Sequence, residues 1–178
     1  SKTKVVYAGG LTKIRGIKEL ILACNNLSDK IELILIGSWV SIEFEESCMN
    51  SIKGEYVNYL GYLKPEEIYQ YLKACDIGIA LLYPIKNYLV SIPVKAFEYL
   101  AAETAMIMSD FPLWKERFKN CAIHVNPYEI NSITESIKLL INDVELRKKL
   151  ISNGRSLVQN EYSWESESER LIKACKDL

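Results

Sequence analysis

Residues 76–82 have the sequence Asp76-Ile77-Gly78-Ile79-Ala80-Leu81-Leu82, an almost uninterrupted apolar run. Such a run predicts a strand that is buried on both faces. After one loop comes Ser91-Ile92-Pro93-Val94-Lys95-Ala96-Phe97-Glu98-Tyr99-Leu100. This second stretch predicts a helix, because proline is tolerated in a first helical turn, and Ser91 or Ile92 would then be the N-cap. The two stretches indicate a strand followed by a helix that starts beside the carboxyl end of that strand.

The same alternation of short apolar runs and helical segments extends over the chain. Five further runs predict strands, at residues 5–9, 31–37, 57–60, 105–109 and 122–125. Segments with helical spacing lie between several of them and after the last one, and one contains Gly154. The predicted strands are too apolar for either face of the sheet to be exposed to solvent. We therefore expect an α/β fold with a Rossmann-like, doubly wound parallel sheet of about six strands and helices on both faces.

Length and composition set limits on the class of protein. The chain has 178 residues, 49% of them hydrophobic, and a net charge of −1. This size allows one full core, so we expect residues 1–178 to form a single domain with C-terminal helices from about residue 130. A nucleic-acid partner is not expected, because the chain has no run of Lys and Arg interleaved with aromatic residues.

The cysteines and the hydropathy of the chain indicate in which cellular compartment the protein is expected. The five cysteines are odd in number and widely spaced, which is typical of reduced thiols in a cytoplasmic protein; they are Cys24, Cys48, Cys75, Cys121 and Cys175. No transmembrane segment and no signal peptide are expected. The chain lacks an initiator methionine and enters a predicted strand almost at once, so we expect it to be part of a longer protein.

Ligands of doubly wound sheets bind outside the carboxyl ends of the strands, which directs attention to the loops there. The first loop is Gly9-Gly10-Leu11-Thr12-Lys13-Ile14-Arg15-Gly16. Its glycines allow close backbone approach, and its two cations could hold phosphate oxygens. It matches neither the dinucleotide fingerprint nor the P-loop pattern. A simple tight turn is an equally good interpretation of this loop by itself.

The helix after Pro93 carries Lys95 and, one turn later, Glu98. Free N–H groups and the helix dipole favour a phosphate at such an N-terminus. A carboxylate like that of Glu98 can accept hydrogen bonds from the two hydroxyls of a ribose. The alternative is a surface Lys-Glu pair worth a few tenths of a kcal/mol.

Other chemistry-bearing residues give weaker signals. His124, the single histidine, falls inside the last predicted strand, where packing is the more common role. No histidine-cysteine cluster with metal-ligand spacing exists, so no metal and no cofactor are expected. Trp39, Trp114 and Trp164 are expected to anchor packing, although Trp39 could also flank a ligand.

The chain resembles the C-terminal, donor-binding domain of retaining GT-B glycosyltransferases, especially the family 4 group (glycosyl transferases group 1). The resemblance rests on a spaced series of motifs over almost the whole chain. These include residues 7–11 with Arg15-Gly16, residues 33–37, 57–61, 74–80 and 91–102, residues 106–110 and 125–127, and Tyr162-Ser163-Trp164.

The resemblance implies site residues and a reaction. A nucleotide-sugar donor would lie with its diphosphate on the first loop and at the helix N-terminus, and with its ribose on Glu98. The base would pack near Gly61, Tyr62 and Leu63, and catalytic residues stay unassigned. The implied diphosphate-binding residues are Gly10, Arg15, Ser91, Ile92 and Lys95.

The implied enzyme is a hexosyltransferase-type glycosyltransferase that moves a sugar from a nucleoside diphosphate to an acceptor hydroxyl without a metal. The resemblance also implies a bacterial, cytoplasmic enzyme of surface polysaccharide synthesis, with possible peripheral membrane association. The acceptor-binding domain would precede Ser1, so this chain alone is not expected to turn over.

Two positions near the expected site depart from the pattern of the family, and so does the turn at residues 101–105, which has neither the usual glycine nor the usual proline. Val90 stands where many members have a glutamate near the transferred sugar, and Gly10 stands where many have an arginine. Lys13 or Lys95 could supply the missing charge. The departures keep two alternatives open: a non-catalytic or degenerate nucleotide-binding or assembly module, and half of a nucleotide-sugar epimerase.

Overall fold

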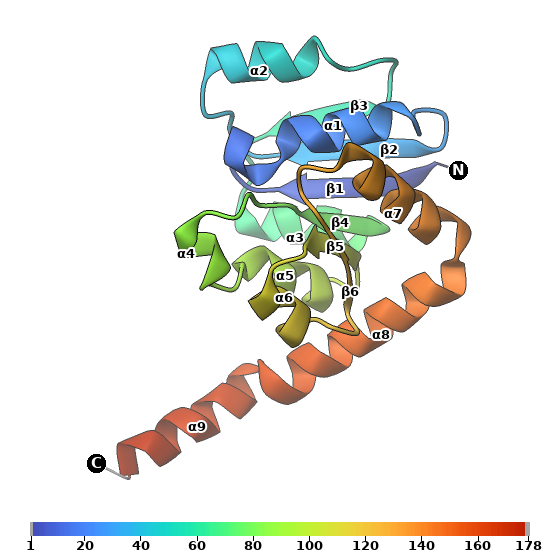
Figure 1. The fold of residues 1–178 in the computed structure, drawn as a ribbon. Coiled ribbons are helices and arrows are strands. Elements are labelled where there is room, and N and C mark those ends of the chain that lie inside the picture. Colours follow the sequence, from blue (N-terminus) through green and yellow to red (C-terminus); the bar gives the residue numbers. More distant parts are fainter. Residues whose placement is uncertain (1, 177–178) are drawn as a thin grey trace.

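A six-stranded, all-parallel sheet forms the centre of the molecule (Figure 1), as the alternation of apolar runs predicts. The computed structural model describes residues 2–176, and these statements refer to that range. The strand order is β3-β2-β1-β4-β5-β6. The strands are β1 (Thr3–Ala8), β2 (Ile31–Ile36), β3 (Val57–Gly61), β4 (Ile77–Ala80), β5 (Ala105–Ser109) and β6 (Ala122–Val125).

All six predicted strands are present; the bounds of β1, β2 and β3 differ by one or two residues from those predicted, and β4 is shorter at both ends. The strand ends at Ala80, two residues before the end of the predicted run, although Leu81 and Leu82 are buried as well. At its other end, the carboxylate of Asp76 accepts a hydrogen bond from the Lys4 N–H at 2.9 Å. Asp76 therefore ties the start of β4 to the start of β1 instead of extending the strand.

Helices occupy the connections between the strands and the C-terminal third of the chain. They are α1 (Ile17–Asn25), α2 (Ile42–Met49), α3 (Pro65–Lys73), α4 (Lys86–Leu89), α5 (Val94–Ala101), α6 (Pro112–Arg117), α7 (Ile130–Asn142), α8 (Val144–Glu161) and α9 (Trp164–Lys176). A short 3-10 turn, η1 (Lys13–Arg15), precedes α1. The sequence analysis predicts no helix at α2, α4 or α6, and all three are short.

Two hydrophobic layers bury the two faces of the sheet. On one face, α1 and α7 pack over alternate residues of the central strands, and Cys48 of α2 joins this layer. On the other face, the buried residues of α3, α5 and α6 form the second layer. Helices on both faces confirm the doubly wound architecture.

Helix α8 passes from one layer to the other. Leu150 in its first half joins the layer of α1 and α7, whereas Leu157 and Val158 pack against the layer of α5. Gly154 lies between these two contacts, and a Cβ there would be 2.4 Å from the Leu100 side chain. The absence of a side chain at Gly154 thus lets α8 approach α5 closely.

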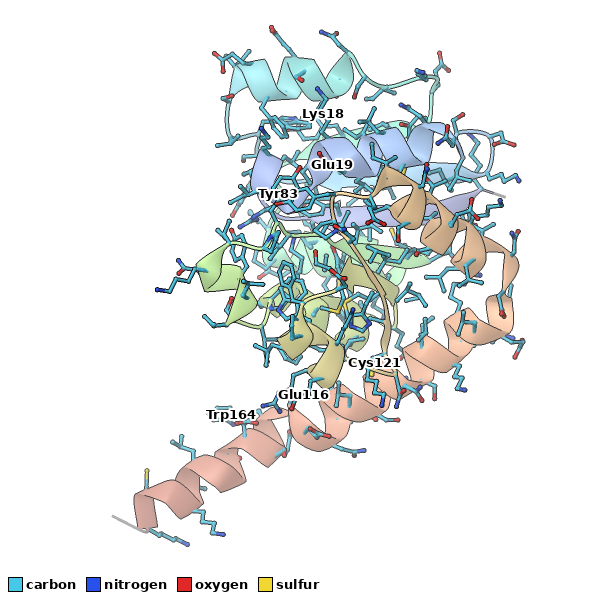
Figure 2. The ribbon with its side chains drawn as sticks, in the orientation of Figure 1. Lys18, Glu19, Tyr83, Glu116, Cys121 and Trp164 are labelled. Atoms are coloured by element: carbon cyan, nitrogen blue, oxygen red, sulfur yellow. The ribbon has the colours of Figure 1, made fainter. Side chains whose placement is uncertain are left out.

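The three tryptophans differ from the expectation that all of them anchor packing. Trp114 is fully buried, and Trp39 is partly buried against Phe44 and Tyr59. Trp164, however, is 74% exposed on α9, which extends away from the sheet (Figure 2). The prediction for Trp164 is wrong, because its helix leaves the body of the domain.

The cysteines are all free thiols; Cys24, Cys48, Cys75 and Cys121 are buried and Cys175 is exposed. Burial raises the pKa of the four buried thiols. Among the described residues, no helix is long and apolar enough to cross a membrane.

Candidate functional site

A cleft lies at the carboxyl ends of β1 and β4, the neighbouring strands at which the strand order reverses direction. Ligands of doubly wound sheets bind at such a switch point. The cleft has a volume of about 340 Å³. Its lining comes from β1, the first loop and the segment from β4 to α5, namely Ala8, Gly9, Arg15, Leu82, Tyr88, Ser91, Pro93, Val94, Lys95 and Glu98.

The first loop is shaped by glycines in conformations that L side chains rarely adopt. Gly9 has φ 138° and Gly37, at the end of β2, has φ 135°. A Cβ on Gly37 would lie 2.0 Å from the carbonyl oxygen of Gly9, so the two loops touch backbone to backbone. This contact fixes the first loop at the floor of the cleft.

Arg15 ends the 3-10 turn and reaches back over the same loop. Its Nη1 donates a long hydrogen bond of 3.5 Å to the Gly10 carbonyl, to which the Tyr7 hydroxyl also donates, at 3.1 Å. Gly10 itself does not line the cleft, but its carbonyl oxygen thus orients Arg15. Lys13, by contrast, is exposed and does not line the cleft.

Lys95 brings a second cation to the first loop from α5. Its Nζ lies 3.7 Å from the centroid of the Tyr7 ring, within the range of a cation–π contact. A Cβ on Gly9 would be 3.0 Å from this Nζ and 3.1 Å from Arg15 Nη1, so both cations converge at Gly9. Although Lys95 as a residue is half-buried, its Nζ is buried and has no hydrogen-bond partner within residues 2–176.

The electrostatics of Lys95 reflect this crowding. Burial and, to a smaller extent, the charge of Arg15 lower the pKa of Lys95 to about 7, against the opposing effect of the Glu98 carboxylate. Burial also raises the pKa of Tyr7 to about 12, so this hydroxyl stays neutral and gives no counter-charge. Two convergent cations with little compensating negative charge favour the binding of an anion.

The start of α5 differs from the prediction in its cap. The helix begins at Val94, and Pro93 occupies the N-cap position in an extended conformation, so neither Ser91 nor Ile92 is the cap. Proline fits there because the backbone is extended (φ −74°, ψ 126°) and no N–H is needed. Within the described part of the chain, no hydrogen bond is donated by the Ser91 or Ile92 amide. Ser91 lines the cleft, whereas Ile92 is not among its lining residues and packs against the hydrophobic layer of α3, α5 and α6.

Glu98 is exposed on α5 and lines two cavities at once. One is the cleft, and the other is a mostly apolar pocket of about 280 Å³ between α3 and α5, lined also by Pro65, Ile68, Tyr69 and Leu72. The carboxylate therefore stands between a cationic site and an apolar one. The sequence analysis did not identify this pocket.

The segment expected beside a base lies apart from both cavities. Gly61 ends β3, the Tyr62 side chain is 76% exposed, and Leu63 packs against the hydrophobic layer of α3 and α5. None of the three lines the cleft or the apolar pocket. The structure thus joins Arg15, Ser91, Lys95 and Glu98 but does not bring this segment into contact with them.

Val90 and His124 add no charged group to the cleft. Val90 is 76% exposed at the end of α4 and carries no carboxylate, as the sequence states. His124 of β6 does not line the cleft, and burial lowers the pKa of its imidazole. Among residues 2–176, no group of three or more His, Cys, Asp or Glu side chains could hold a metal ion.

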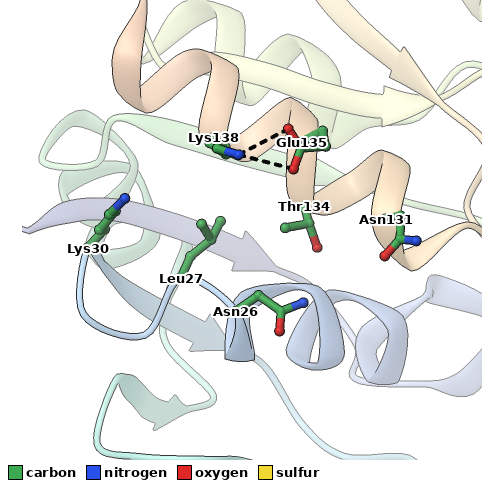
Figure 3. A pocket seen from close by; sticks show the side chains of 7 residues that line it. All are labelled: Asn26, Leu27, Lys30, Asn131, Thr134, Glu135 and Lys138. Atoms are coloured by element: carbon green, nitrogen blue, oxygen red, sulfur yellow. Dashed lines mark hydrogen bonds and ion pairs between the residues drawn. The ribbon is translucent and has the colours of Figure 1, made fainter.

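A larger hollow lies elsewhere, between the C-terminal end of α1 and α7 (Figure 3). It measures about 530 Å³ and is polar, and its Lys138 and Glu135 pair with each other at 3.4 Å. Lys30, which precedes β2, places it at the amino ends of the strands. It is an open surface hollow in which Thr134, Glu135 and Lys138 already have partners within the protein, so size alone does not mark the functional site.

Comparisons with known proteins were made on this fold. A family model described as "Glycosyl transferases group 1" matches residues 1–157. No curated protein sequence matches the chain. Among solved structures, the C-terminal domain of a glycosyl transferase group 1 family protein (LpcC) from Francisella tularensis has a TM-score of 0.80 at 21% identity, with 91% of this chain and 87% of that chain covered.

Two longer structures are similar over the whole of this chain. HepE from Anabaena in complex with UDP has a TM-score of 0.88 at 15% identity, with 99% of this chain and 49% of that chain covered. Sucrose-phosphate synthase from Thermosynechococcus elongatus has a TM-score of 0.83 at 22% identity, with coverage of 99% and 45%. The chain thus spans about half the length of these two proteins, and the likeness shows a common fold.

Proposed function

Because this chain belongs to the glycosyl transferases group 1 family, we propose that it is the donor-binding half of a retaining glycosyltransferase. The enzyme would move a sugar, as a hexosyltransferase does, from a nucleoside diphosphate to an acceptor hydroxyl. An acceptor-binding domain would complete the cleft. The finer setting we propose, bacterial surface polysaccharide synthesis in the cytoplasm with peripheral membrane association, follows from the family resemblance.

The observation that carries the proposal is the buried, unpartnered Nζ of Lys95 beside Arg15. A buried ammonium group without a partner lowers the stability of a fold, so a ligand that pairs with it gains affinity. A diphosphate offers two negative groups to two cations. In this proposal Lys95 replaces the arginine that many family members have where this chain has Gly10.

Each of the other site residues has a role in the same pose. The amides of Ser91 and Ile92 would donate to the phosphate that leaves with the nucleotide, as anions bind at helix N-termini. Glu98 would accept from the ribose hydroxyls, since it stands between the cationic cleft and the apolar pocket. The apolar pocket would hold the face of a base; Gly61, Tyr62 and Leu63, the segment expected near the base, do not line this pocket. The cations Arg15 and Lys95 would neutralise the leaving diphosphate, so we propose no metal cofactor.

A second candidate is a nucleotide-binding or assembly module without catalysis. It is favoured by Val90, because no carboxylate replaces the family's glutamate there. An epimerase half is less well supported, because His124 lies outside the cleft that such chemistry would use.

Ligand-induced stabilisation tests the proposal. At about 100 times its dissociation constant, a ligand stabilises the fold by about 2.7 kcal/mol, which raises the melting midpoint of a domain this size by about 5–10 °C. We expect this shift with at least one of UDP, GDP, ADP and their sugar conjugates. Glu98→Ala should then weaken binding by about tenfold or more, because a charge-assisted contact is lost.

Glu135→Ala is the matched control, since Glu135 is a glutamate on another helix that lines only the hollow of Figure 3. Its affinity should equal that of the wild type. If no nucleotide shifts the melting midpoint of either the wild type or Glu98→Ala, the donor-binding proposal is wrong and an assembly module is the better interpretation.

A further inference from the structure

The indole of Trp114 makes a specific polar contact to the loop before α5. Its Nε1–H donates to the Ser91 carbonyl at 2.7 Å. Trp114 itself is fully buried on α6, with its ring centroid 4.6 Å from that of Phe111. A short hydrogen bond therefore connects a rigid, packed side chain to the loop that lines the cleft.

This contact determines where a neighbouring donor points. The Ser91 carbonyl and the Ile92 N–H belong to one planar trans peptide unit, so they point in opposite directions. With the carbonyl held by the buried indole, the Ile92 N–H is directed away from Trp114. The next residue, Pro93, has no N–H, so Ile92 holds the last free amide before α5 begins.

Packing alone does not explain the hydrogen bond. A phenylalanine would fill much of the same apolar space, and only the indole brings an N–H. Trp39 shows that a buried indole N–H need not have a hydrogen-bond partner. Its Nε1 is buried and has none within residues 2–176. The bond from Trp114 is thus a property of its place beside Ser91.

We propose that Trp114 is a positioning residue of the phosphate site: it orients the Ser91–Ile92 peptide so that the Ile92 N–H meets the terminal phosphate of a nucleoside diphosphate. The proposal rests on the proposed donor-binding function. It adds a residue that does not touch the ligand and lies on α6, far from the first loop in sequence. It also assigns the recognition of one phosphate group to one amide.

The test compares Trp114→Phe with the wild-type chain by titration calorimetry. The probes are the nucleoside diphosphate that binds best among UDP, GDP and ADP, and the corresponding monophosphate. We expect the diphosphate to bind about three- to tenfold more weakly to Trp114→Phe, the value of one lost hydrogen bond, with little change for the monophosphate. A purely structural role would change both affinities alike.

Phe111→Leu is the matched control, because it disturbs the same packing without removing the indole N–H. It should leave the ratio of the two affinities unchanged. An unchanged ratio in Trp114→Phe overturns the positioning role while the donor site stands. Failure of the wild type to bind any of the three diphosphates overturns both proposals.

A second measurement needs no variant and covers the case in which Trp114→Phe does not fold. In ¹⁵N-labelled wild-type protein, the Ile92 amide and the Trp114 indole resonances should both shift with the diphosphate and not with the monophosphate. If the Ile92 resonance stays in place at saturation with the diphosphate, the proposed contact does not form.

Discussion

The ammonium group of Lys95 lies over the Tyr7 ring with the Arg15 guanidinium beside it. Three side chains contact or influence this group, namely Tyr7 of β1, Arg15 of η1 and Glu98 of α5, and Tyr88 of α4 lines the same cleft. Of these only Glu98 carries a negative charge, and it is exposed. The local balance is therefore cationic, and it makes the protonation of Lys95 depend on what occupies the cleft.

This balance predicts that diphosphate affinity falls as the pH rises above about 7. In the empty cleft Lys95 has a pKa of about 7, whereas a bound anion favours its charged form and raises that pKa. Above pH 7 binding therefore takes up a proton, and the affinity should fall by up to about tenfold per pH unit. Titration calorimetry between pH 7 and 9 with a nucleoside-diphosphate sugar, whose phosphates do not titrate there, measures the slope.

Lys95→Met is the control for this slope. It should bind the diphosphate weakly and with no pH dependence in the same range. The folding stability of the empty wild-type chain should change in the opposite direction: unfolded lysine holds its proton up to about pH 10.4, so the unfolded state binds more protons above pH 7 and stability rises with pH. An affinity that is flat with pH in the wild type would contradict the buried position of Lys95.

The individual cations and the carboxylate of the site could be predicted from the sequence, but the residues that hold them in place could not. Arg15, Lys95 and Glu98 could be chosen because of their places at predicted loop and helix starts, and Arg15 and Lys95 do converge. The role of Tyr7 could not be predicted, because a tyrosine within an apolar strand has no pattern that distinguishes a ring under an ammonium group from simple packing. The same holds for Trp114, whose partner is 23 residues away in the chain.

Helix α5 is placed against the sheet by contacts with Tyr99. The ring of Tyr99 lies on Gly78 of β4, where a Cβ would be 2.7–2.8 Å from three ring carbons. Its hydroxyl donates to the Ile79 carbonyl at 3.0 Å and accepts from the Ala8 N–H at 3.3 Å. Because Lys95 and Glu98 are on the same helix, these contacts also position the two site residues.

Gly78→Ala should therefore destabilise the fold by about 1–3 kcal/mol, as overpacking does, and weaken nucleotide binding as well. The ring is flat and held at both ends, so it cannot move aside. Chemical denaturation gives the free energy of unfolding. Gly154→Ala is the comparison. The added methyl group meets the flexible end of the Leu100 side chain, and alanine stabilises a helix by about 1 kcal/mol relative to glycine. The unfolding free energy should therefore fall less in Gly154→Ala than in Gly78→Ala. Equal losses would contradict this account.

Hydrophobic periodicity did not predict where every helix begins or whether every short helix is present. The expected first-turn place of Pro93 was wrong by one position, because the extended backbone continues through it to Val94. Helix α2 was not predicted, because only Cys48 of its eight residues is buried. Its sequence therefore has almost no apolar stripe that would indicate a helix. The longer helices α1, α3 and α7 follow apolar stripes and could be predicted.

For the whole molecule, the class of fold was predictable and the strand order was not. Strands apolar on both faces, separated by helical segments, require a parallel sheet with two covered faces, and that sheet is present. No local pattern states that β1 lies between β2 and β4. The exposure of Trp164 could not be predicted from local patterns either. A tryptophan at the start of a helix does not indicate whether that helix packs against the sheet.

The length of this chain bears on whether it can complete a sugar transfer by itself. The chain spans about half the length of HepE and sucrose-phosphate synthase, and in the proposed function its cleft holds a diphosphate and a ribose while the rest of the protein supplies the acceptor-binding domain. We expect this 178-residue chain to bind a nucleotide sugar and to release no nucleoside diphosphate from it. Chromatography of the nucleotide after long incubation with simple sugar acceptors checks this, and sugar transfer by this chain alone would show the expectation to be wrong.

The central place of β1 has a consequence for synthesis on the ribosome. β1 is made before both of its neighbours, and it pairs with β2 on one side and with β4 on the other, through Val5 and Ile77. At about 5–20 residues per second, the ribosome needs roughly 4–15 s to add the intervening segment. During that interval the apolar edge of β1 that faces β4 has no native neighbour and is open to aggregation. The strand whose carboxyl end lines the ligand cleft is thus also a segment that is prone to aggregation until β4 has been made.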